Sequence, residues 1–470
     1  MNKRAFKDFR NVLISSVITL LSSVLVSFVV PKIMNVTDYG YYKTFTLYAT
    51  YSALLQFGFF EGIYLRHSGE NYENLNKEKF RSYFKLYFLM ELILSLVFFI
   101  IMILTAKDEY LFIFICMAIY IVIFNVSSFF QTISQMVMRF NEYSYRNILK
   151  SILNIILVVS LFVIYITQKN NIDFKIYIIS FLFINLGITL MYIYTYKDII
   201  FGPSYKFREI KEDVKSFFVT GFPLLISNLC STLLLTLDRQ FVNVLYDKET
   251  YAYYAFAYNL TTLVSVLASS ISIILFPNLK KLDKEKINKS FDKISISLLL
   301  LLLLSIACYF PIDVFVRWFL PKYISSLNIL RIIFPGLAIT SYITVVTQNF
   351  YKTDEKNSLF FLKSVIVLII SFIANVIAYL IFETPAAISY ASIISAFIWY
   401  IISEYRYRNI NKPNRIKNTL IILMFTFIFY GLSVIKNIYL ECLLYVVIFV
   451  FLALVFYRKD LRKILKKEVD

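Results

Sequence analysis

The chain has 470 residues, of which 59% are hydrophobic and only 17% charged, and its mean hydropathy is +0.70. A chain this apolar would not stay in aqueous solution, so the composition excludes a soluble globular protein and indicates one that lies in a lipid bilayer. The formal net charge of +18 could suggest a nucleic-acid partner, but the placement of the basic residues, described below, argues against one.

Apolar stretches of about twenty residues, the length that crosses ~30 Å of hydrocarbon, recur along the whole chain. About fourteen of them lie near residues 11–34, 44–65, 84–104, 110–138, 147–167, 174–195, 217–245, 251–276, 294–310, 324–351, 358–381, 386–403, 418–435 and 438–457. Because lipid offers backbone N–H and C=O groups no partner, each crossing should be a helix. The predicted fold class is therefore an all-α integral membrane protein.

Lys and Arg residues alternate between the two sets of loops that this span pattern defines. If the N-terminus is cytoplasmic, 37 of the 48 basic residues fall on the cytoplasmic side and ten on the opposite side. This asymmetry is the positive-inside rule, and it supports the span pattern independently of hydropathy. It also predicts that both termini are cytoplasmic.

The sequence offers no constellation for catalysis or metal binding. The first span follows basic residues, as in a signal peptide, but its apolar run is too long and no cleavage pattern closes it, so we expect it to be retained. The only histidine, His67, lies in a loop. The cysteines lie in apolar segments without metal-ligand spacing and are interpreted as packing residues: Cys116, Cys230, Cys308 and Cys442. No cofactor is expected.

The chain resembles itself at an offset of about 212 residues. Residues 39–42, YGYY, align with 251–254, YAYY, and residues 149–151, LKS, align with 362–364 at an offset of 213. Such a constant offset indicates two homologous halves of six helices each. The predicted division is 1–205 and 206–412 for the two bundles and 413–470 for an extra helix pair with a basic tail. Since the period holds an even number of helices, both halves have the same orientation, which suggests alternating access around a central cavity.

This layout, together with residues 38–42 (DYGYY), 237–239 (LDR) and 275–277 (LFP), resembles the multidrug/oligosaccharidyl-lipid/polysaccharide exporter superfamily. Within it, the chain is similar to the Wzx-type flippases of O-antigen or capsule repeat units. One departure is visible: Ala252 replaces the glycine of the first half, Gly40, and only nine glycines occur overall. We therefore do not expect the close backbone approaches of other members to transfer.

The resemblance implies a carrier in the bacterial plasma membrane that moves undecaprenyl-pyrophosphate-linked oligosaccharides from the inner to the outer leaflet, as a monomer in contact with membrane lipids and coupled to H⁺ or Na⁺. A cation-coupled multidrug exporter on the same scaffold is the first alternative, although it would normally lack the C-terminal helix pair. A membrane-embedded polysaccharide polymerase is the second, but the outside loops are short and hold no histidine.

Charged residues within spans are costly, roughly 2.5 to 3.5 kcal/mol at the helix centre, so each needs a reason. Glu91 lies six residues past Lys85, about 9 Å along its helix, and could bind H⁺ or Na⁺ in a cavity or hydrogen-bond a neighbouring helix. Arg331 could attract a pyrophosphate or an acidic sugar, or its side chain could extend to the outer interface.

Asp238 and Arg239 are adjacent, so in a helix their side chains should point about 100° apart and not face one partner together. Either contact with substrate or an interhelical ion pair could explain them. Glu61 and Arg66 lie near the cytoplasmic end of the second span, where anchoring at the interface is the simpler interpretation.

Polar and aromatic side chains form a second group of candidates. Gln131 and Gln135 share a helix face, and Gln348 repeats Gln135 in the second half. Amides could bind sugar hydroxyls or hold membrane helices together. Tyrosines such as Tyr254 and Tyr258 could stack on sugars, although tyrosines more often form the aromatic belt at the membrane interface.

Overall fold

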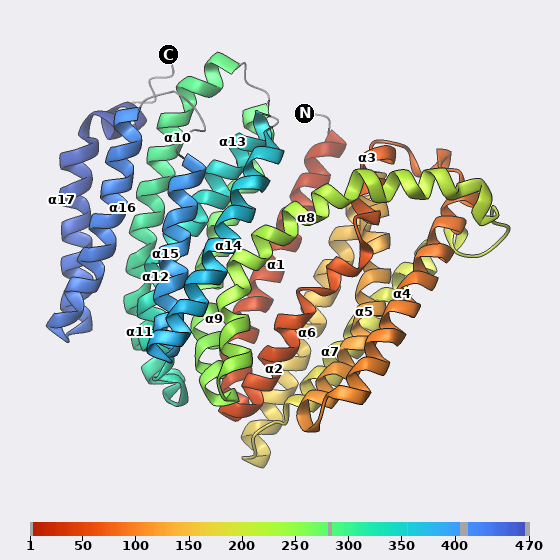
Figure 1. Ribbon diagram of the computed structural model, residues 1–470, viewed down its shortest axis with the longest axis horizontal. Helices are drawn as coiled ribbons and strands as arrows, with labels where there is room; N and C mark the ends of the chain where they lie inside the picture. Colours follow the sequence, from red (N-terminus) through yellow and green to blue (C-terminus); the bar gives the residue numbers. More distant parts are fainter. Residues whose placement is uncertain (1–2, 281–283, 355, 405–411, 466–470) are drawn as a thin grey trace. The chain divides into compact units, whose positions relative to one another are not determined.

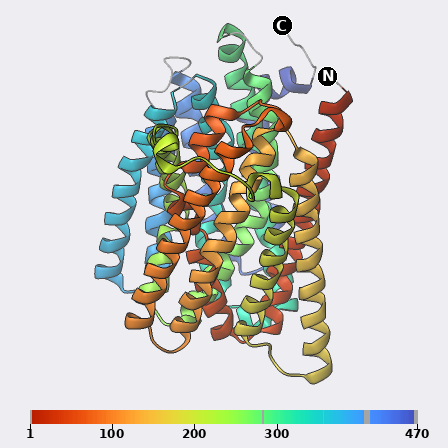
Figure 2. The same cartoon turned by 90° about the vertical axis from the view of Figure 1, so that its right-hand side faces the viewer.

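The computed structural model describes residues 3–280, 284–354, 356–404 and 412–465, and every regular element within these ranges is helical. Figures 1 and 2 show long helices whose axes run in similar directions within each part of the chain. The prediction of an all-α membrane protein is confirmed by this fold, which leaves no strand edge in the described part of the chain.

The chain packs as two units, residues 1–232 and 233–470, with the boundary inside helix α8. Unit 1 contains α1 (Lys3–Ile33), α2 (Val36–Ala49), η1 (Ser52–Gln56), α3 (Phe59–His67), η2 (Tyr72–Asn74), α4 (Lys77–Thr105), α5 (Asp108–Met136), α6 (Phe140–Gln168), α7 (Phe174–Thr195), η3 (Lys197–Ile199) and most of α8 (Phe207–Leu245). The division into 1–205, 206–412 and 413–470 stays a prediction about the duplication.

Unit 2 holds the end of α8 and the elements that follow it. These are α9 (Lys248–Lys280), α10 (Lys284–Ser305), η4 (Ile306–Cys308), α11 (Tyr309–Phe319), η5 (Pro321–Tyr323), α12 (Ser326–Tyr342), the π-helical turn η6 (Ile343–Thr347), α13 (Gln348–Thr353), α14 (Asn357–Phe382), α15 (Pro385–Glu404), α16 (Lys412–Leu432), η7 (Ser433–Ile435) and α17 (Ile438–Leu465).

Eleven helical segments of the described residues are long and apolar enough to cross a membrane, and the bent pair 207–226 and 229–245 would make a twelfth. The two further spans in the predicted set of about fourteen are 44–65 and 251–276. The first is broken into α2, η1 and α3, and the second falls on α9. The helix order therefore agrees with the predicted layout.

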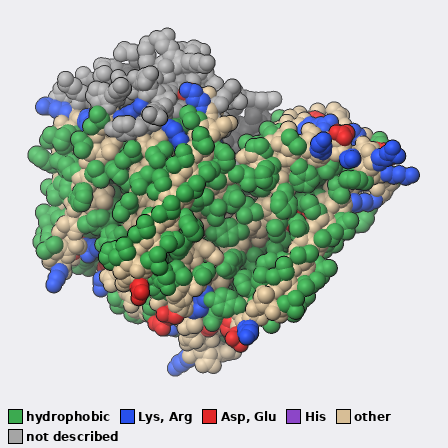
Figure 3. Space-filling model, viewed as in Figure 1, with side chains coloured by type: hydrophobic (Ala, Val, Ile, Leu, Met, Phe, Trp, Pro, Cys, Tyr) green, Lys and Arg blue, Asp and Glu red, His purple; other side chains and the backbone are tan. Residues whose placement is uncertain are grey.

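Large hydrophobic side chains are exposed along the helices. On the face shown in Figure 3, hydrophobic side chains cover the middle of the helices, while Lys and Arg side chains gather near the helix ends. Leu104 is 79% exposed, Phe427 70% and Leu380 69%. A surface of this kind is stable only against lipid tails, which explains how the sequence tolerates so few charges.

The same helix pairs pack in both units. In unit 1, α5 packs against α2, α4 and α7, and in unit 2 the corresponding α12 packs against α9, α10 and α15. The aligned YGYY and YAYY segments also match, since Tyr39, Tyr42, Tyr251 and Tyr254 are all buried. This correspondence agrees with the internal duplication read from the sequence.

The second span of unit 1 is broken in its middle, and α8 packs on the break. Phe57 and Gly58 have positive φ angles of 50° and 87° between η1 and α3. A Cβ on Gly221 of α8 would lie 1.8 Å from the carbonyl oxygen of Gly58 and 2.7 Å from the backbone nitrogen of Gly62. Three of the nine glycines thus form one close backbone contact. Whether the close approaches of other superfamily members transfer to this chain stays a prediction.

Candidate functional site

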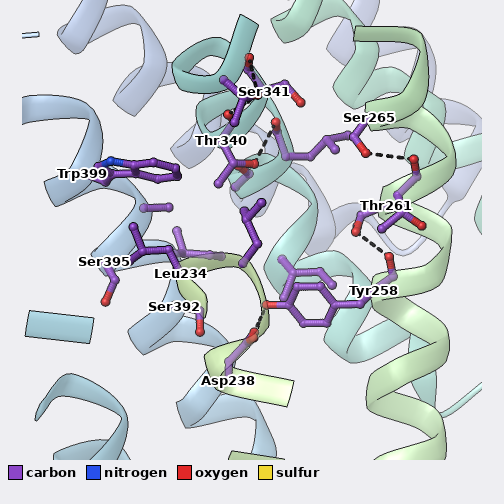
Figure 4. A pocket seen from close by; sticks show the side chains of 18 of the residues that line it. Leu234, Asp238, Tyr258, Thr261, Ser265, Thr340, Ser341, Ser392, Ser395 and Trp399 are labelled. Carbon is purple, nitrogen blue, oxygen red and sulfur yellow. Dashed lines mark hydrogen bonds between the residues drawn. The ribbon is translucent and has the colours of Figure 1, made fainter. Parts of the chain in front are cut away.

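Unit 2 contains a cavity of about 390 Å³ between α8, α9, α12 and α15 (Figure 4). Its lining joins one acidic and one basic side chain, Asp238 and Arg239, to two aromatic side chains, Tyr258 and Trp399. A cavity of this size with few polar groups and an apolar remainder has the usual character of a small-ligand site.

Asp238 lies at one end of the cavity and is only 3% exposed. Its Oδ2 accepts hydrogen bonds from the hydroxyl of Tyr254, at 3.0 Å, and from the hydroxyl of Tyr258. Both tyrosines lie on α9, at positions four residues apart that share one helix face. These donors compensate the loss of hydration that would otherwise make a buried carboxylate costly. Tyr254 is completely buried, so it does not belong to an interfacial belt.

Arg239 contacts the same tyrosine. Its Cζ lies 5.0 Å from the centroid of the Tyr258 ring, and Nη2 donates to the carbonyl of Leu235. The prediction that Asp238 and Arg239 cannot face one partner together was therefore wrong. The helical angle between neighbours holds at the Cβ atoms, but the long arginine side chain turns back along α8 and reaches across the Tyr258 ring.

Hydroxyl side chains are interspersed among the apolar residues of the remaining wall. They come in groups spaced three or four residues apart on α9, on α12 with the π-helical turn η6 that follows it, and on α15, which places each group on one helix face. The residues are Thr261, Thr262, Ser265, Thr340, Ser341, Thr344, Ser392 and Ser395. Our sequence reasoning missed this wall, although the spacing of these residues within apolar spans was a readable signal.

Trp399 closes the side of the cavity opposite Tyr258 in Figure 4. It is 2% exposed, and its Nε1 makes no hydrogen bond with the described residues. Tryptophans of membrane proteins usually lie at the interface, so an indole within a helix bundle is a further signal that the sequence reasoning did not use.

Arg331 does not line this cavity, and it forms an ion pair with Glu441 that joins α12 to α17. Its Cζ lies 5.3 Å from the Tyr309 ring centroid. The hydroxyl of Tyr430 reinforces the attachment of the C-terminal helix pair by donating to the carbonyl of Ile332 at 2.6 Å. The structure therefore gives Arg331 a packing partner within unit 2.

Replacing Glu441 with alanine should destabilise unit 2 by about 2 kcal/mol, below the roughly 3 to 5 kcal/mol of fully buried pairs, because the Arg331 side chain is 26% exposed. The apparent melting temperature of the purified protein in detergent measures this effect. The double variant Arg331→Met, Glu441→Leu should recover most of the loss, since it leaves no unpaired charge. Equal losses in both variants would show that the pair does not hold the helices together.

Glu91 is completely buried in unit 1, at the break in the second span. Asn125 on α5 donates through Nδ2 to Glu91 Oε2 at 2.9 Å and to the backbone carbonyl of Ser52 in η1 at 3.1 Å. The other carboxylate oxygen, Oε1, makes no hydrogen bond of good geometry with the described residues. The carboxylate thus lies inside the bundle, and one amide links it to the backbone of the broken span.

Glu61 and Arg66, both on α3, have partners within unit 1. Gln56 Nε2 donates to Glu61 Oε2 at 2.7 Å, and Arg66 Nη2 lies 2.8 Å from Asp213 Oδ1 on α8. The ion pair ties α3 to the start of α8, whereas interface anchoring alone would need no such partner.

The three glutamines do not gather in one site. Gln131 Nε2 lies 3.4 Å from Ser127 Oγ one turn earlier on α5, and Gln135 is half-buried near the end of that helix. Gln348 follows the π-helical turn η6 and is also half-buried, outside the cavity lining. Neither sugar binding nor helix association is favoured by these contacts.

His67 contacts Glu70 through Nδ1 at 2.9 Å. Cys116 and Cys230 are buried, as packing residues should be, while Cys308 is exposed and Cys442 half-buried. Within the described residues, no group of three His, Cys, Asp or Glu side chains has the arrangement of a metal site.

The long apolar helices and their exposed hydrophobic surface define a multi-pass membrane protein. Residues 9–283 match the family model described as polysaccharide biosynthesis protein, and the chain belongs to this family. No match was found among curated protein sequences.

Two solved structures share the fold. A lipid II flippase MurJ in an inward closed conformation aligns over 97% of this chain and 99% of its own, with a TM-score of 0.71 and 16% identity. An inward-facing multidrug resistance MATE transporter of the MOP superfamily aligns over 87% of this chain and 95% of its own, with a TM-score of 0.56 and 16% identity. The predicted fold is thereby confirmed, and the family match agrees with the resemblance to polysaccharide exporters.

Proposed function

We propose that this protein flips undecaprenyl-pyrophosphate-linked oligosaccharide units from the inner to the outer leaflet of a bacterial plasma membrane, for surface polysaccharide assembly such as O-antigen or capsule. The observation that carries the proposal is the hydroxyl-lined cavity with Asp238 and Arg239 inside a membrane-embedded unit. A saccharide headgroup needs polar partners during its passage through the bilayer, and a cavity lined by hydroxyl and charged groups supplies them.

The transport cycle we propose is alternating access by the two homologous halves. Hydroxyl groups from α9, α12 and α15 replace the water that the sugar loses, while the lipid chain stays in the surrounding bilayer. The matching fold of a lipid II flippase, a protein whose name states a lipid-linked substrate, supports this proposal. The excess of basic residues on alternate loops supports cytoplasmic termini.

Glu91 is the residue we propose for ion coupling. A fully buried carboxylate within a membrane helix is costly unless it has a function or a matched partner, and the Asn125 amide that donates to Glu91 is neutral. The carboxylate can take up H⁺ or bind Na⁺ together with the Ser52 carbonyl, which shares the Asn125 amide. Binding of either ion at Glu91 would couple the transmembrane gradient of that ion to the broken span of unit 1.

Leaflet exposure of lipid-linked oligosaccharide in spheroplasts tests the proposal. Deleting the gene should leave the oligosaccharide on the inner leaflet, protected from a membrane-impermeant glycosidase. Restoring the gene should bring the oligosaccharide to the outer leaflet, where the glycosidase cleaves it. Unchanged exposure in the deletion strain, combined with greater drug sensitivity, would favour the multidrug exporter.

A further inference from the structure

The hydrogen-bonding capacity of the cavity in unit 2 is divided unevenly between acceptors and donors. Six of the wall hydroxyls donate to backbone carbonyls three or four residues earlier on their own helices, at 2.7 to 3.0 Å. These are Thr261, Thr262, Ser265, Thr340, Thr344 and Ser395. Because each hydroxyl hydrogen is used, the oxygen lone pairs are what the wall offers to a ligand. The wall therefore suits a ligand that is rich in hydroxyl donors.

The unused donors belong to two other side chains. Arg239 Nε and Trp399 Nε1 are both buried and make no hydrogen bond within the described part of the chain. Neither group can accept a hydrogen bond. Because the charged guanidinium can only donate, a ligand beside Arg239 is favoured if it brings acceptor oxygens.

The nearby carboxylate is already occupied. Asp238 Oδ2 accepts from Tyr254 and Tyr258, and Oδ1 accepts from the backbone nitrogen of Arg239 at 2.8 Å. These donors are neutral, so Asp238 keeps its negative charge, but both of its oxygens are engaged. The Arg239 guanidinium lies over the Tyr258 ring at 5.0 Å. It is then the charged group in the lining that can donate to an oxyanion, to which it presents a planar pair of donors.

We propose, on the basis of the proposed function, that this cavity is the subsite for a sugar that carries an oxyanion. The sugar hydroxyls donate to the wall of serine and threonine side chains, its ring packs between Tyr258 and Trp399, and its oxyanion binds Arg239. The oxyanion is either the phosphate that joins the first sugar to the lipid or the carboxylate of an acidic sugar, and both share this chemistry.

The chain provides its own fluorescent probe for this subsite. It has two tryptophans, and Trp318 is 75% exposed on α11, outside the cavity lining. Trp318→Phe therefore leaves Trp399 as the single tryptophan. The purified variant in detergent is titrated with glucose 1-phosphate, glucuronate, glucose and inorganic phosphate while the Trp399 emission is recorded.

We expect saturable quenching by at least one anionic sugar, with a Kd at least about tenfold below those of glucose and of inorganic phosphate. Binding of glucose 1-phosphate alone identifies the lipid-linked phosphate, binding of glucuronate alone identifies an acidic sugar, and binding of both shows that charge on a sugar suffices. Arg239→Gln in the same background should remove the preference over glucose, and Arg239→Lys should keep part of it.

Glucose binding as tightly as the anionic sugars, wild-type preference in Arg239→Gln, or no binding of any sugar would overturn the proposal. If Arg239→Gln melts at the same temperature as its parent, a loss of sugar binding in this variant is not caused by a loss of folding. The assay needs no transport, so its failure is distinct from failure of the proposed function, which the spheroplast measurement reports.

Discussion

Alanine at Gly221 should destabilise unit 1 by about 3 kcal/mol, at the upper end of overpacking costs. The added Cβ would lie 1.8 Å from the carbonyl oxygen of Gly58, where neither partner is a flexible side chain that can turn away. Relief requires α8 to move off the break between η1 and α3, which would also separate the buried contacts of Phe217. The yield of folded protein in detergent and its apparent melting temperature measure the loss.

Two other helical glycines give matched controls. Alanine at Gly187 on α7 or at Gly431 on α16 meets no atom within 4 Å, so these changes should be neutral or raise stability by up to about 1 kcal/mol. If Gly221→Ala melts at the temperature of these controls, the close contact between α8 and the broken span does not exist as described.

Glu91→Gln should reduce flipping driven by an imposed H⁺ or Na⁺ gradient by about tenfold, in the lower part of the usual range for coupling between two sites. Glutamine keeps the shape of the side chain and an acceptor oxygen for Asn125, but it cannot exchange a proton or neutralise a cation. The remaining activity should therefore be independent of the gradient. Proteoliposomes with a defined gradient and a fluorescent lipid-linked oligosaccharide give this measurement.

Glu78→Gln, an exposed position at the start of the same helix α4, controls for the loss of one acidic residue. It should respond to the gradient as the parent does. A Glu91→Gln protein that keeps its full response to both ions would remove Glu91 from the coupling mechanism and leave it a packing role.

The global fold could be predicted from the sequence because the lipid environment imposes a strict rule on length and polarity. Apolar runs, alternating basic loops and the constant offset of the repeat each depend on many residues, so local irregularities do not disturb them. The break at Phe57 and Gly58 was not predicted, because a span interrupted by a short 3₁₀ segment has nearly the composition of a continuous one.

The site was predicted only in part, for a different reason. Asp238 and Arg239 were recognised because charge is rare within a span, but the partner of each charge depends on which helices pack together. Arg331 also lies well inside a predicted span, but in the structure it forms an ion pair with Glu441 and does not line the cavity. The serines, threonines and Trp399 around the cavity carry no charge, so they were hidden among the many polar residues that hold membrane helices together.

Flipping by a protein with a filled cavity tests most directly whether the cavity in unit 2 carries the saccharide. Thr340→Trp places a bulky indole among the wall residues of α12, and Leu380→Trp places one on the exposed surface of α14, where the native side chain is 69% exposed. In proteoliposomes, at equal melting temperatures, we predict loss of oligosaccharide flipping for Thr340→Trp and parental rates for Leu380→Trp. Parental flipping by a stable Thr340→Trp protein would contradict the account.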